Sequence, residues 1–501
     1  VDGSHPDLAG NLWVNPGEIA DNGLDDDGNG FVDDLHGCNV VGEPGDHSGD
    51  SSDYHGHGTH VAGIVAAQAF NGQGGCGVAF NTRIMAVRSA QSSGVLTTPD
   101  IVDGILYATE QGADVINMSF GGYQRSQLVA DALAVALNQA VLVAAAGNDG
   151  IDSRVRPAYP AALHFVIGIM AATPPPSPGL AWFSNHGPHY EVKAPGVSIH
   201  STLPGGQYAA WSGTSMAAPV VAGAAALMRS YYWQREIYSS RFLMGCLVAS
   251  EHLDVHAAIT SPPPPGVSLH DQWLFDDAEI DADNLVNGRI DAGETVHLGI
   301  EAINRSGQAD SVTATLRARA QGGAVDDPYV TIVTDTVSFG DIGPFNVQDN
   351  GFIYDEGGEI TGVDTPFVVE IDPDCPNDHV IPFEITFTFY DGWNADNPDP
   401  IQHVDRFEMS VQKGRNVPTV IEAGTTETLT QDNLWIIGGP VLVEEGATLR
   451  VTEGARIQWG TVSADPYNPG PQPGNIVVRG IMEVEGTAAN PVSLFPSYLV
   501  S

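Results

Sequence analysis

Three short segments carry side chains suited to acyl transfer at points where a helix or strand is expected to begin or end. Ser215 opens a run of small and apolar residues that predicts a helix. The free backbone N–H groups at a helix start favour the oxyanion that forms when a serine attacks a carbonyl. His57 opens a second such run, where a neutral imidazole can act as a general base. Asn148 follows a buried apolar run, so its amide can donate to the same oxyanion.

Each segment also has a simpler interpretation when it is taken alone. Ser215 can be a cap before an ordinary packed helix, and Asn148 can belong to a plain turn. His55, His57 and His60 can instead be metal ligands, although no His-Glu-x-x-His pattern accompanies them.

Four segments together resemble the subtilisin-like serine peptidases in order and approximate spacing, and the resemblance extends from Val1 to about Ile259. The segments are His57-Gly58-Thr59-His60-Val61-Ala62-Gly63, Asn117-Met118-Ser119-Phe120-Gly121-Gly122, Ala146-Gly147-Asn148 and Gly213-Thr214-Ser215-Met216-Ala217-Ala218-Pro219. Four separate matches make the resemblance specific.

The resemblance implies a role for each matched residue. Ser215 corresponds to the nucleophile, His57 to the general base, and Asn148 to the oxyanion donor beside the Ser215 backbone N–H. The resemblance also implies that an extended peptide or protein substrate binds by strand pairing to Ser119, Phe120 and Gly121. It implies that the specificity pocket is lined by Ala144, Ala146 and Gly147.

The sequence departs from the family at the triad acid. The family's acid lies in an Asp-Ser/Thr-Gly motif followed by an aliphatic residue and then, after three residues, His-Pro-Asp-Leu. Here His5-Pro6-Asp7-Leu8 is present and Val1 takes the aliphatic position, so the acid is expected three residues before Val1. Asp2 is too close to His5 to replace it. Because loss of this acid costs on the order of 10⁴ in turnover, we expect the chain to be nearly inactive and part of a longer protein.

An acidic loop predicts a structural Ca²⁺ site. Asp25, Asp27 and Asn29 stand at positions 1, 3 and 5 of a loop of EF-hand type, and Gly30 follows them. The usual Glu at position 12 is missing, so Asp33 or Asp34 is expected to close the site. A solvated acidic turn without a cation is the alternative. A similar loop at 281–294 is a weaker candidate for Ca²⁺.

Composition limits what else the chain can do. The 501 residues suffice for about three domains. The net charge is −43, so binding to nucleic acid or to anionic membranes is not expected. No apolar run reaches the roughly 18 residues of a membrane-spanning helix. Four cysteines are too few for a disulfide scaffold, although a pair between Cys38 and Cys76 would suit an exported enzyme.

The elements that must position these residues follow from periodicity. Strands are expected at 82–87, 115–119 and 140–145, with helices at 101–109 and 128–137 between them, which predicts an α/β domain with a doubly wound, mostly parallel sheet over residues 1–259. A Pro-rich linker follows at 260–266. Alternating residues at 267–415 predict an antiparallel β-sandwich of immunoglobulin-like type, and short repeated apolar units at 416–501 predict the start of a parallel β-solenoid.

The leading hypothesis is therefore an extracellular or cell-surface serine endopeptidase with accessory β-rich modules. The alternative is a surface adhesion or carbohydrate-binding protein with a secondary peptidase domain. Fold alone does not decide between them. The oligomeric state, the cleavage specificity and the natural substrate do not follow from the sequence.

Overall fold

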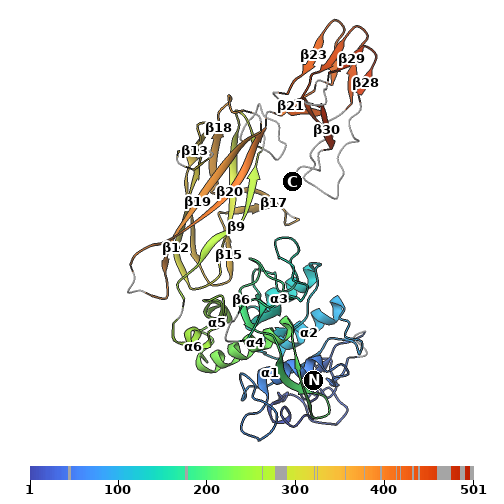
Figure 1. Ribbon diagram of the computed structural model, residues 1–501, viewed down its shortest axis with the longest axis vertical. Coiled ribbons are helices and arrows are strands. Elements are labelled where there is room, and N and C mark those ends of the chain that lie inside the picture. Colours follow the sequence, from blue (N-terminus) through green and yellow to red (C-terminus); the bar gives the residue numbers. More distant parts are fainter. Residues whose placement is uncertain are drawn as a thin grey trace.

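The computed structural model describes residues 1–42, 47–174, 179–261, 263–276, 290–320, 322–323, 325–355, 357–376, 378–394, 398–412, 414–417, 419–431, 434–437, 440–459, 476–485 and 491–496. Helices are gathered in the first half of the chain, drawn blue to green in Figure 1, and the second half is built from strands. The helices are η1 (Ala9–Asn11), α1 (His57–Ala66), α2 (Thr98–Glu110), α3 (Gln127–Ala136), α4 (Thr214–Tyr231), α5 (Ser240–Leu247) and α6 (Val255–Thr260).

The first half has an α/β fold. Its strands are β1 (Gly37–Asn39), β2 (Ala86–Arg88), β3 (Val115–Met118), β4 (Val141–Ala145), β5 (Ile167–Ala172), β6 (Val192–Pro195), β7 (Ile199–Leu203) and β8 (Gln207–Trp211). Strands β3, β4, β5 and β6 form one parallel sheet in that order, while β1 and β2 form a separate parallel pair. Strands β7 and β8 form an antiparallel hairpin. The parallel sheet brings the carboxyl ends of β3 and β4 to the same edge.

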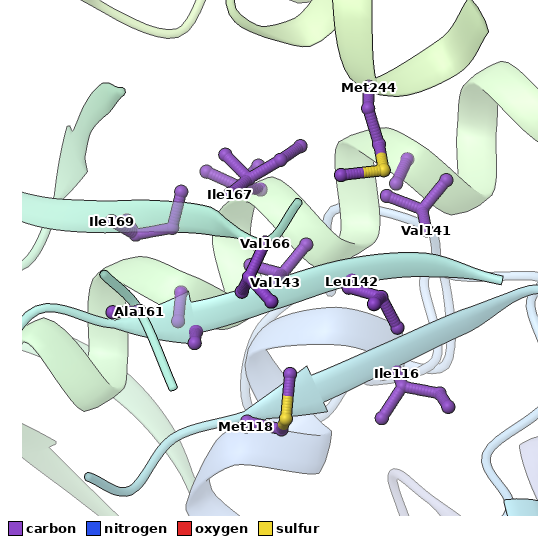
Figure 2. Close-up of a cluster of buried hydrophobic side chains, with 14 of the residues drawn as sticks. Ile116, Met118, Val141, Leu142, Val143, Ala161, Val166, Ile167, Ile169 and Met244 are labelled. Atoms are coloured by element: carbon purple, nitrogen blue, oxygen red, sulfur yellow. The ribbon is translucent and has the colours of Figure 1, made fainter. Parts of the chain in front are cut away.

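The core of this half lies between the parallel sheet and its helices. Strand β4 is buried along its whole length, as expected for a strand covered on both faces. Helix α4 contacts all four strands of the sheet, and α5 packs against β4. Figure 2 shows this core, in which Val141 and Ile167 from the sheet lie near Met244 of α5.

Most elements expected in this half are found, with shifted ends. The strand expected at 82–87 is shorter, because residues 79–82 form a turn in which Thr82 N–H donates to Ala79 O. Ile84 therefore makes only an isolated bridge to Leu12 before β2 begins. Among the described residues, no helix is both long and apolar enough to cross a bilayer.

The middle of the chain forms two sheets around one hydrophobic core. Its strands are β9 (Val267–Phe275), β10 (Ile290–Asp291), β11 (Thr295–Asn304), β12 (Ala309–Ala318), β13 (Val330–Thr334), β14 (Thr336–Ile342), β15 (Asn346–Asp349), β16 (Phe352–Tyr354), β17 (Ile360–Val363), β18 (Phe367–Ile371), β19 (His379–Asp391) and β20 (Ile401–Gln412). One sheet has the order β10-β20-β19-β12-β14, and the other contains β13-β18-β11-β15 with β9 beside β11. All pairs within these two sheets are antiparallel except β10 with β20. Alternate residues of β19 are buried, which agrees with the expected period of two.

The last part of the chain stacks short parallel strands. They are β21 (Gly414–Asn416), β22 (Val420–Ile421), β23 (Thr426–Leu429), β24 (Leu434–Ile437), β25 (Val441–Val443), β26 (Thr448–Val451), β27 (Arg456–Trp459), β28 (Ile476–Val478), β29 (Ile481–Val484) and β30 (Ser493–Pro496). Residues of β22, β23 and β24 pair with residues 22 positions later, as Thr426 does with Thr448 and Leu434 with Arg456, while β21 pairs with β24 at an offset of 20. Such a repeat lets each layer cover the apolar side chains of the next.

Candidate active site

Ser215 is the second residue of α4, and its hydroxyl is held by the segment after β3. The Ser215 hydroxyl donates to the Ser119 carbonyl at 3.0 Å, and the Ser119 hydroxyl donates back to the Ser215 carbonyl at 2.9 Å. The second bond has a local cause. Pro219 lies four residues after Ser215 and has no N–H, so the Ser215 carbonyl lacks its usual helical partner. Ser119 therefore supplies the donor that the helix cannot.

Asn148 follows β4 and is fixed by the start of the same helix. Its side-chain oxygen accepts from the Thr214 N–H at 2.8 Å and from the Thr214 hydroxyl at 3.0 Å. The backbone donor identifies the accepting end of the amide as Oδ1. A Cβ placed on Gly213 would lie 3.6 Å from Asn148 Nδ2 and 3.7 Å from Ser215 N. Asn148 Oδ1 would also lie 3.6 Å from it, so the whole amide group lies beside Gly213 and the backbone of Ser215.

His57 is the first residue of α1, and Asp53 caps this helix. The Asp53 carboxylate accepts from the backbone N–H groups of His55, Gly56 and Thr59 and from the Thr59 hydroxyl, at 2.6 to 2.8 Å. Gly56 adopts a left-handed conformation with φ 94°, which glycine tolerates. Burial alone would raise the pKa of Asp53, but the hydrogen bonds from Thr59, Gly56 and His55 hold it at about 2.

The imidazole of His57 is kept in its neutral form. Burial lowers its pKa below 6.5, nearby His55 and His60 add to the effect, and Asp53 opposes it. Among the described residues no hydrogen bond joins His57 to Ser215, and the Ser215 hydroxyl donates to the Ser119 carbonyl instead. Ser119 lines the same cavity as His57 and so connects the two parts of the site.

The carboxylates near the start of the chain serve other partners. Asp2 accepts from Ser4 and from the Gly205 N–H, and Asp7 accepts from Asn71 and from the Tyr208 hydroxyl. No described carboxylate forms a hydrogen bond to the His57 ring. The described carboxylates of this half therefore leave the His57 ring without an acidic hydrogen-bond partner.

A cavity of about 1050 Å³ runs beside His57, between β2 and β3. Among the described strands, β2 pairs only with β1 and β3 pairs only with β4, so each presents one unpaired edge. Apolar side chains from both strands and from the surrounding helices line the cavity, including Val87, Val115, Met118, Val61, Ile105 and Ala222. His57, Gly58 and Val1 lie along its wall. Unpaired edges beside an apolar channel are suited to accept an extended strand.

The residues expected to bind substrate lie at the carboxyl ends of β3 and β4, with Ala144 still inside β4. Ser119, Phe120 and Gly121 follow β3, and the next residue, Gly122, pairs with Tyr159 in both directions at 2.9 and 2.7 Å. Ser119 and Phe120 line the cavity. Ala144 and Ala146 are fully buried, while Gly147 is partly exposed and donates its N–H to the Thr214 hydroxyl. The specificity pocket stays a prediction.

The acidic loop is organised differently from a ring of Asp25, Asp27, Asn29 and Asp33. Asp25 accepts backbone N–H groups of Gly28, Asn29 and Gly30, and Asp33 accepts those of Asn22 and Gly23. Asp27 instead lies with Glu18 and Asp34, and oxygens of these three carboxylates are within 4.8 Å of one another. Sequence reasoning missed Glu18, which precedes the loop, and used Asp34 only as a local alternative. The loop expected at 281–294 lies largely outside the described residues.

Cys38 and Cys76 are not joined, so the possible disulfide between them is not formed. Cys38 is buried and Cys76 exposed. Burial raises the pKa of the Cys38 thiol, which makes it a packed apolar group and not a nucleophile.

Comparison with known proteins identifies the family of the first half of the chain. The profile of the subtilase family, peptidase S8, matches residues 1–253. A thermophilic serine proteinase of Bacillus sp. (strain AK1) is 46% identical over 186 residues, which are 37% of this chain and 45% of that protein. Subtilisin DY of Bacillus licheniformis is 47% identical, and the match covers 38% of this chain and 71% of subtilisin DY. The major intracellular serine protease of Bacillus subtilis (strain 168) is 38% identical, and the match covers 44% of this chain and 70% of that protease. The chain thus spans less than half of the first of these relatives. Their names give no support to the alternative of an adhesion protein.

Proposed function

Because the chain belongs to the subtilase family of serine peptidases, we propose that it hydrolyses peptide bonds through an acyl-enzyme on Ser215. His57 acts as the general base, and Asn148 Nδ2 and the Ser215 N–H stabilise the oxyanion. The observation that supports the proposal is that the Asn148 amide is bound to Thr214 at the start of α4, directly beside Ser215. A tetrahedral intermediate needs hydrogen-bond donors at the point where its negative oxygen forms.

The cavity beside His57 supports a further part of the proposal. We propose that an extended strand lies between β2 and β3, parallel to both, and presents a carboxylate to the His57 ring. The unpaired edges of β2 and β3 provide hydrogen-bonding partners for such a strand, and the apolar lining of the cavity covers its side chains. The carboxylate would hold the imidazole in the tautomer that accepts the Ser215 proton.

Substrate binding is proposed for the residues beyond the same sheet edge. An extended peptide would pair with the main chain of Ser119, Phe120 and Gly121, while Ala144, Ala146 and Gly147 would border the side-chain pocket. Main-chain pairing explains why a peptide or protein substrate is expected without a fixed sequence. It also requires Ser215 to exchange the Ser119 carbonyl for His57 as its hydrogen-bond partner.

The remaining parts are proposed as accessory modules. We assign residues 1–259 to the peptidase domain, 260–266 to a linker, 267–415 to an immunoglobulin-like sandwich and 416–501 to a solenoid-like module. Helix α6 ends at Thr260, β9 begins at Val267 and β21 begins at Gly414, which supports these boundaries. A location outside the cell or at its surface is also proposed. One relative is named an intracellular protease, so fractionation of the producing cells is needed to test this location.

Peptide hydrolysis by a strand-completed chain tests the proposed function. An extension with an apolar run followed by Asp-Ser-Gly would be joined to Val1, and a matched chain would carry Asn in place of that Asp. We expect the Asp form to turn over a chromogenic peptide about 10⁴-fold faster than the Asn form. Asn148→Ala in the Asp form should lower kcat by about 10²–10³ with little change in KM, whereas Asn138→Ala, at an exposed position, should change neither. Equal rates for the Asp and Asn forms would contradict the proposal.

A further inference from the structure

The turn between β14 and β15 belongs to the middle of the chain, but its aromatic side chain is buried in the first half. Phe345 is 1% exposed and lies in the hydrophobic cluster formed by the parallel sheet and its helices. Among the described residues, the other buried members of this cluster all lie between 105 and 258. Phe345 is therefore part of the core of the first half, although it comes from the two-sheet part of the chain.

The backbone of Phe345 has a conformation that a bulky residue rarely adopts. Its φ is 54°, in the left-handed region, which is costly for an aromatic residue. Such a conformation persists only where the surrounding contacts impose it. Here the Phe345 carbonyl accepts a hydrogen bond from Arg241 of α5 at 2.7 Å, and the ring is enclosed by the core of the first half. The first half therefore holds this turn in place.

Helix α5 also approaches the backbone of the middle part closely. A Cβ placed on Gly245 would lie 2.7 Å from the Ser306 carbonyl oxygen and 3.2 Å from Pro344 Cβ, so a larger residue does not fit there. Phe242 of α5 meets Trp393, which follows β19, in a T-shaped arrangement with ring centroids 4.6 Å apart. One helix thus contacts three separate connections, those after β11, β14 and β19.

The linker between the two parts is fixed to the same region. The Ser306 hydroxyl donates to the Pro264 carbonyl at 2.9 Å, and the Gly266 N–H donates to the Asn304 side chain at 3.1 Å. A Pro-rich segment is already stiff, and these bonds join it to the turn after β11 that meets α5. The middle part is therefore held close to α5 by its linker as well as by the contact itself.

The contact is made through the helix that covers the amino ends of the central strands. Met244 of α5 lies near Val141 and Ile167, which are the first residues of β4 and β5 (Figure 2). Ser119 and Asn148 follow the carboxyl ends of β3 and β4. The contact therefore supports the sheet at the edge opposite to the candidate active site.

We propose that the middle part, residues 267–415, is an integral part of the peptidase fold with Phe345 as its anchor, and that the two parts unfold in one cooperative transition. Domains of one chain usually move relative to each other unless their interface is large and hydrophobic. Here a buried aromatic ring, a close approach of α5 to the Ser306 backbone and the ion pair between buried Glu191 and Arg305 join the two parts. Any processed form of the enzyme accordingly retains 267–415, and a cleavage that shortens the chain falls beyond β20.

Hydrogen exchange of the whole chain, read by mass spectrometry at increasing urea concentration, tests the proposal. Peptides from β4 and from β19 should lose protection at the same urea midpoint. Phe387→Leu should lower both midpoints, although Phe387 is buried in the separate core of the middle part. Val333→Ala, at an exposed position of β13, is the control and should leave both unchanged. A midpoint of β4 that stays at the parental value in Phe387→Leu would overturn the proposal.

Variants of α5 test the contact itself. Alanine is a better helix former than glycine, so helix propensity alone predicts that Gly245→Ala raises the midpoints. We expect this variant to lower both midpoints instead, because its Cβ would collide with the Ser306 carbonyl. Arg241→Ala should also lower them, since the Phe345 carbonyl loses its donor. Raised midpoints in Gly245→Ala would show that the close approach is absent and would count against the proposal.

Cleavage of the linker separates the contact from the covalent connection. A site for a specific protease would be inserted after Ser261, which is exposed, and the cut chain would be analysed by gel filtration. We expect the two parental fragments to elute together and those of Phe345→Ala to separate. Separation of the parental fragments, or joint elution in both proteins, would contradict the role of Phe345 as anchor. Exchange and elution do not depend on activity, so failure of the proposed peptidase function would leave these results unaffected.

Discussion

At the scale of single residues, the proposed mechanism depends on the protonation state of His57. A general base must be unprotonated, and burial favours that form in His57 by lowering its pKa. In the proposed mechanism the same burial disfavours the imidazolium that forms when Ser215 transfers its proton to His57. A carboxylate supplied to the other ring nitrogen would offset this cost, because an opposite charge within a few ångströms raises the pKa.

We therefore predict how His57 titrates. In the chain described here its pKa should lie below 6.5, and in the strand-completed Asp form it should rise. Because the folded pKa is lowered, the folded state of this chain binds fewer protons than the unfolded state, so its stability should fall as the pH drops through 6.5. NMR of the ring protons, assigned with His57→Gln, measures both values. A pKa of His57 that is the same in the Asp and Asn forms would contradict the placement of the acid.

At the scale of elements, the start of α4 depends on a bond from outside the helix. Pro219 removes the N–H that would bind the Ser215 carbonyl, and the Ser119 hydroxyl takes its place. Asn117 Nδ2 in turn donates to this hydroxyl at 3.0 Å. The end of β3 and the start of α4 are thereby joined at the nucleophile, so a change in either element moves Ser215.

A double-mutant cycle tests this link. Ser119→Ala should lower the free energy of unfolding by about 1–3 kcal/mol, because it leaves the Ser215 carbonyl without a donor. Pro219→Ala restores a backbone N–H, so Ser119→Ala should cost less in that background. Urea unfolding of the four proteins measures the coupling. If Ser119→Ala costs the same in both backgrounds, the two donors do not compete for the Ser215 carbonyl.

Local sequence patterns predicted the helices and the strand that carry the site. They did not predict groups that come together through contacts between residues far apart in the sequence. Runs of small residues predicted helices beginning near His57 and Ser215, and the apolar run before Asn148 predicted a buried strand. The spacing of apolar residues over a few turns or strand positions is enough to predict such helices and strands. The cluster of Glu18 and Asp34 depends on Tyr107 of α2, more than 70 residues further along the chain than Asp34. No spacing within the loop could reveal that contact.

At the scale of the whole molecule, the first half and the middle of the chain share a contact rich in titratable groups. Arg305, which follows β11, forms an ion pair with buried Glu191 at 2.5 Å. His164 of the first half lies 5.1 Å from His270 of β9, measured between ring centroids. Burial and the neighbouring His270 and Arg305 lower the pKa of His164 to about 4. Burial raises the pKa of Glu191 to about 7, although Arg305 opposes this. Protonation of either group therefore changes the contact.

These shifts predict opposite pH effects. His164 has a lowered folded pKa, so the stability it contributes is lost as the pH falls from 6.5 towards 4. Glu191 has a raised folded pKa, so its contribution grows as the pH falls from 7 towards 4.5. His164→Gln should therefore reduce the loss of stability between pH 6.5 and 4, measured by urea unfolding. His252→Gln, at an exposed position, is the control. If both variants follow the parent curve, His164 is not the acid-sensitive group at this contact.

Covalent labelling tests most directly whether Ser215 is a nucleophile activated by His57. The strand-completed Asp form would be treated with a serine-directed phosphonate and analysed by mass spectrometry of the whole chain and of its peptides. We predict one adduct, located on Ser215, absent from Ser215→Ala and formed far more slowly in His57→Ala. An adduct on another serine, or labelling of Ser215 at the same rate with and without His57, would contradict the assignment.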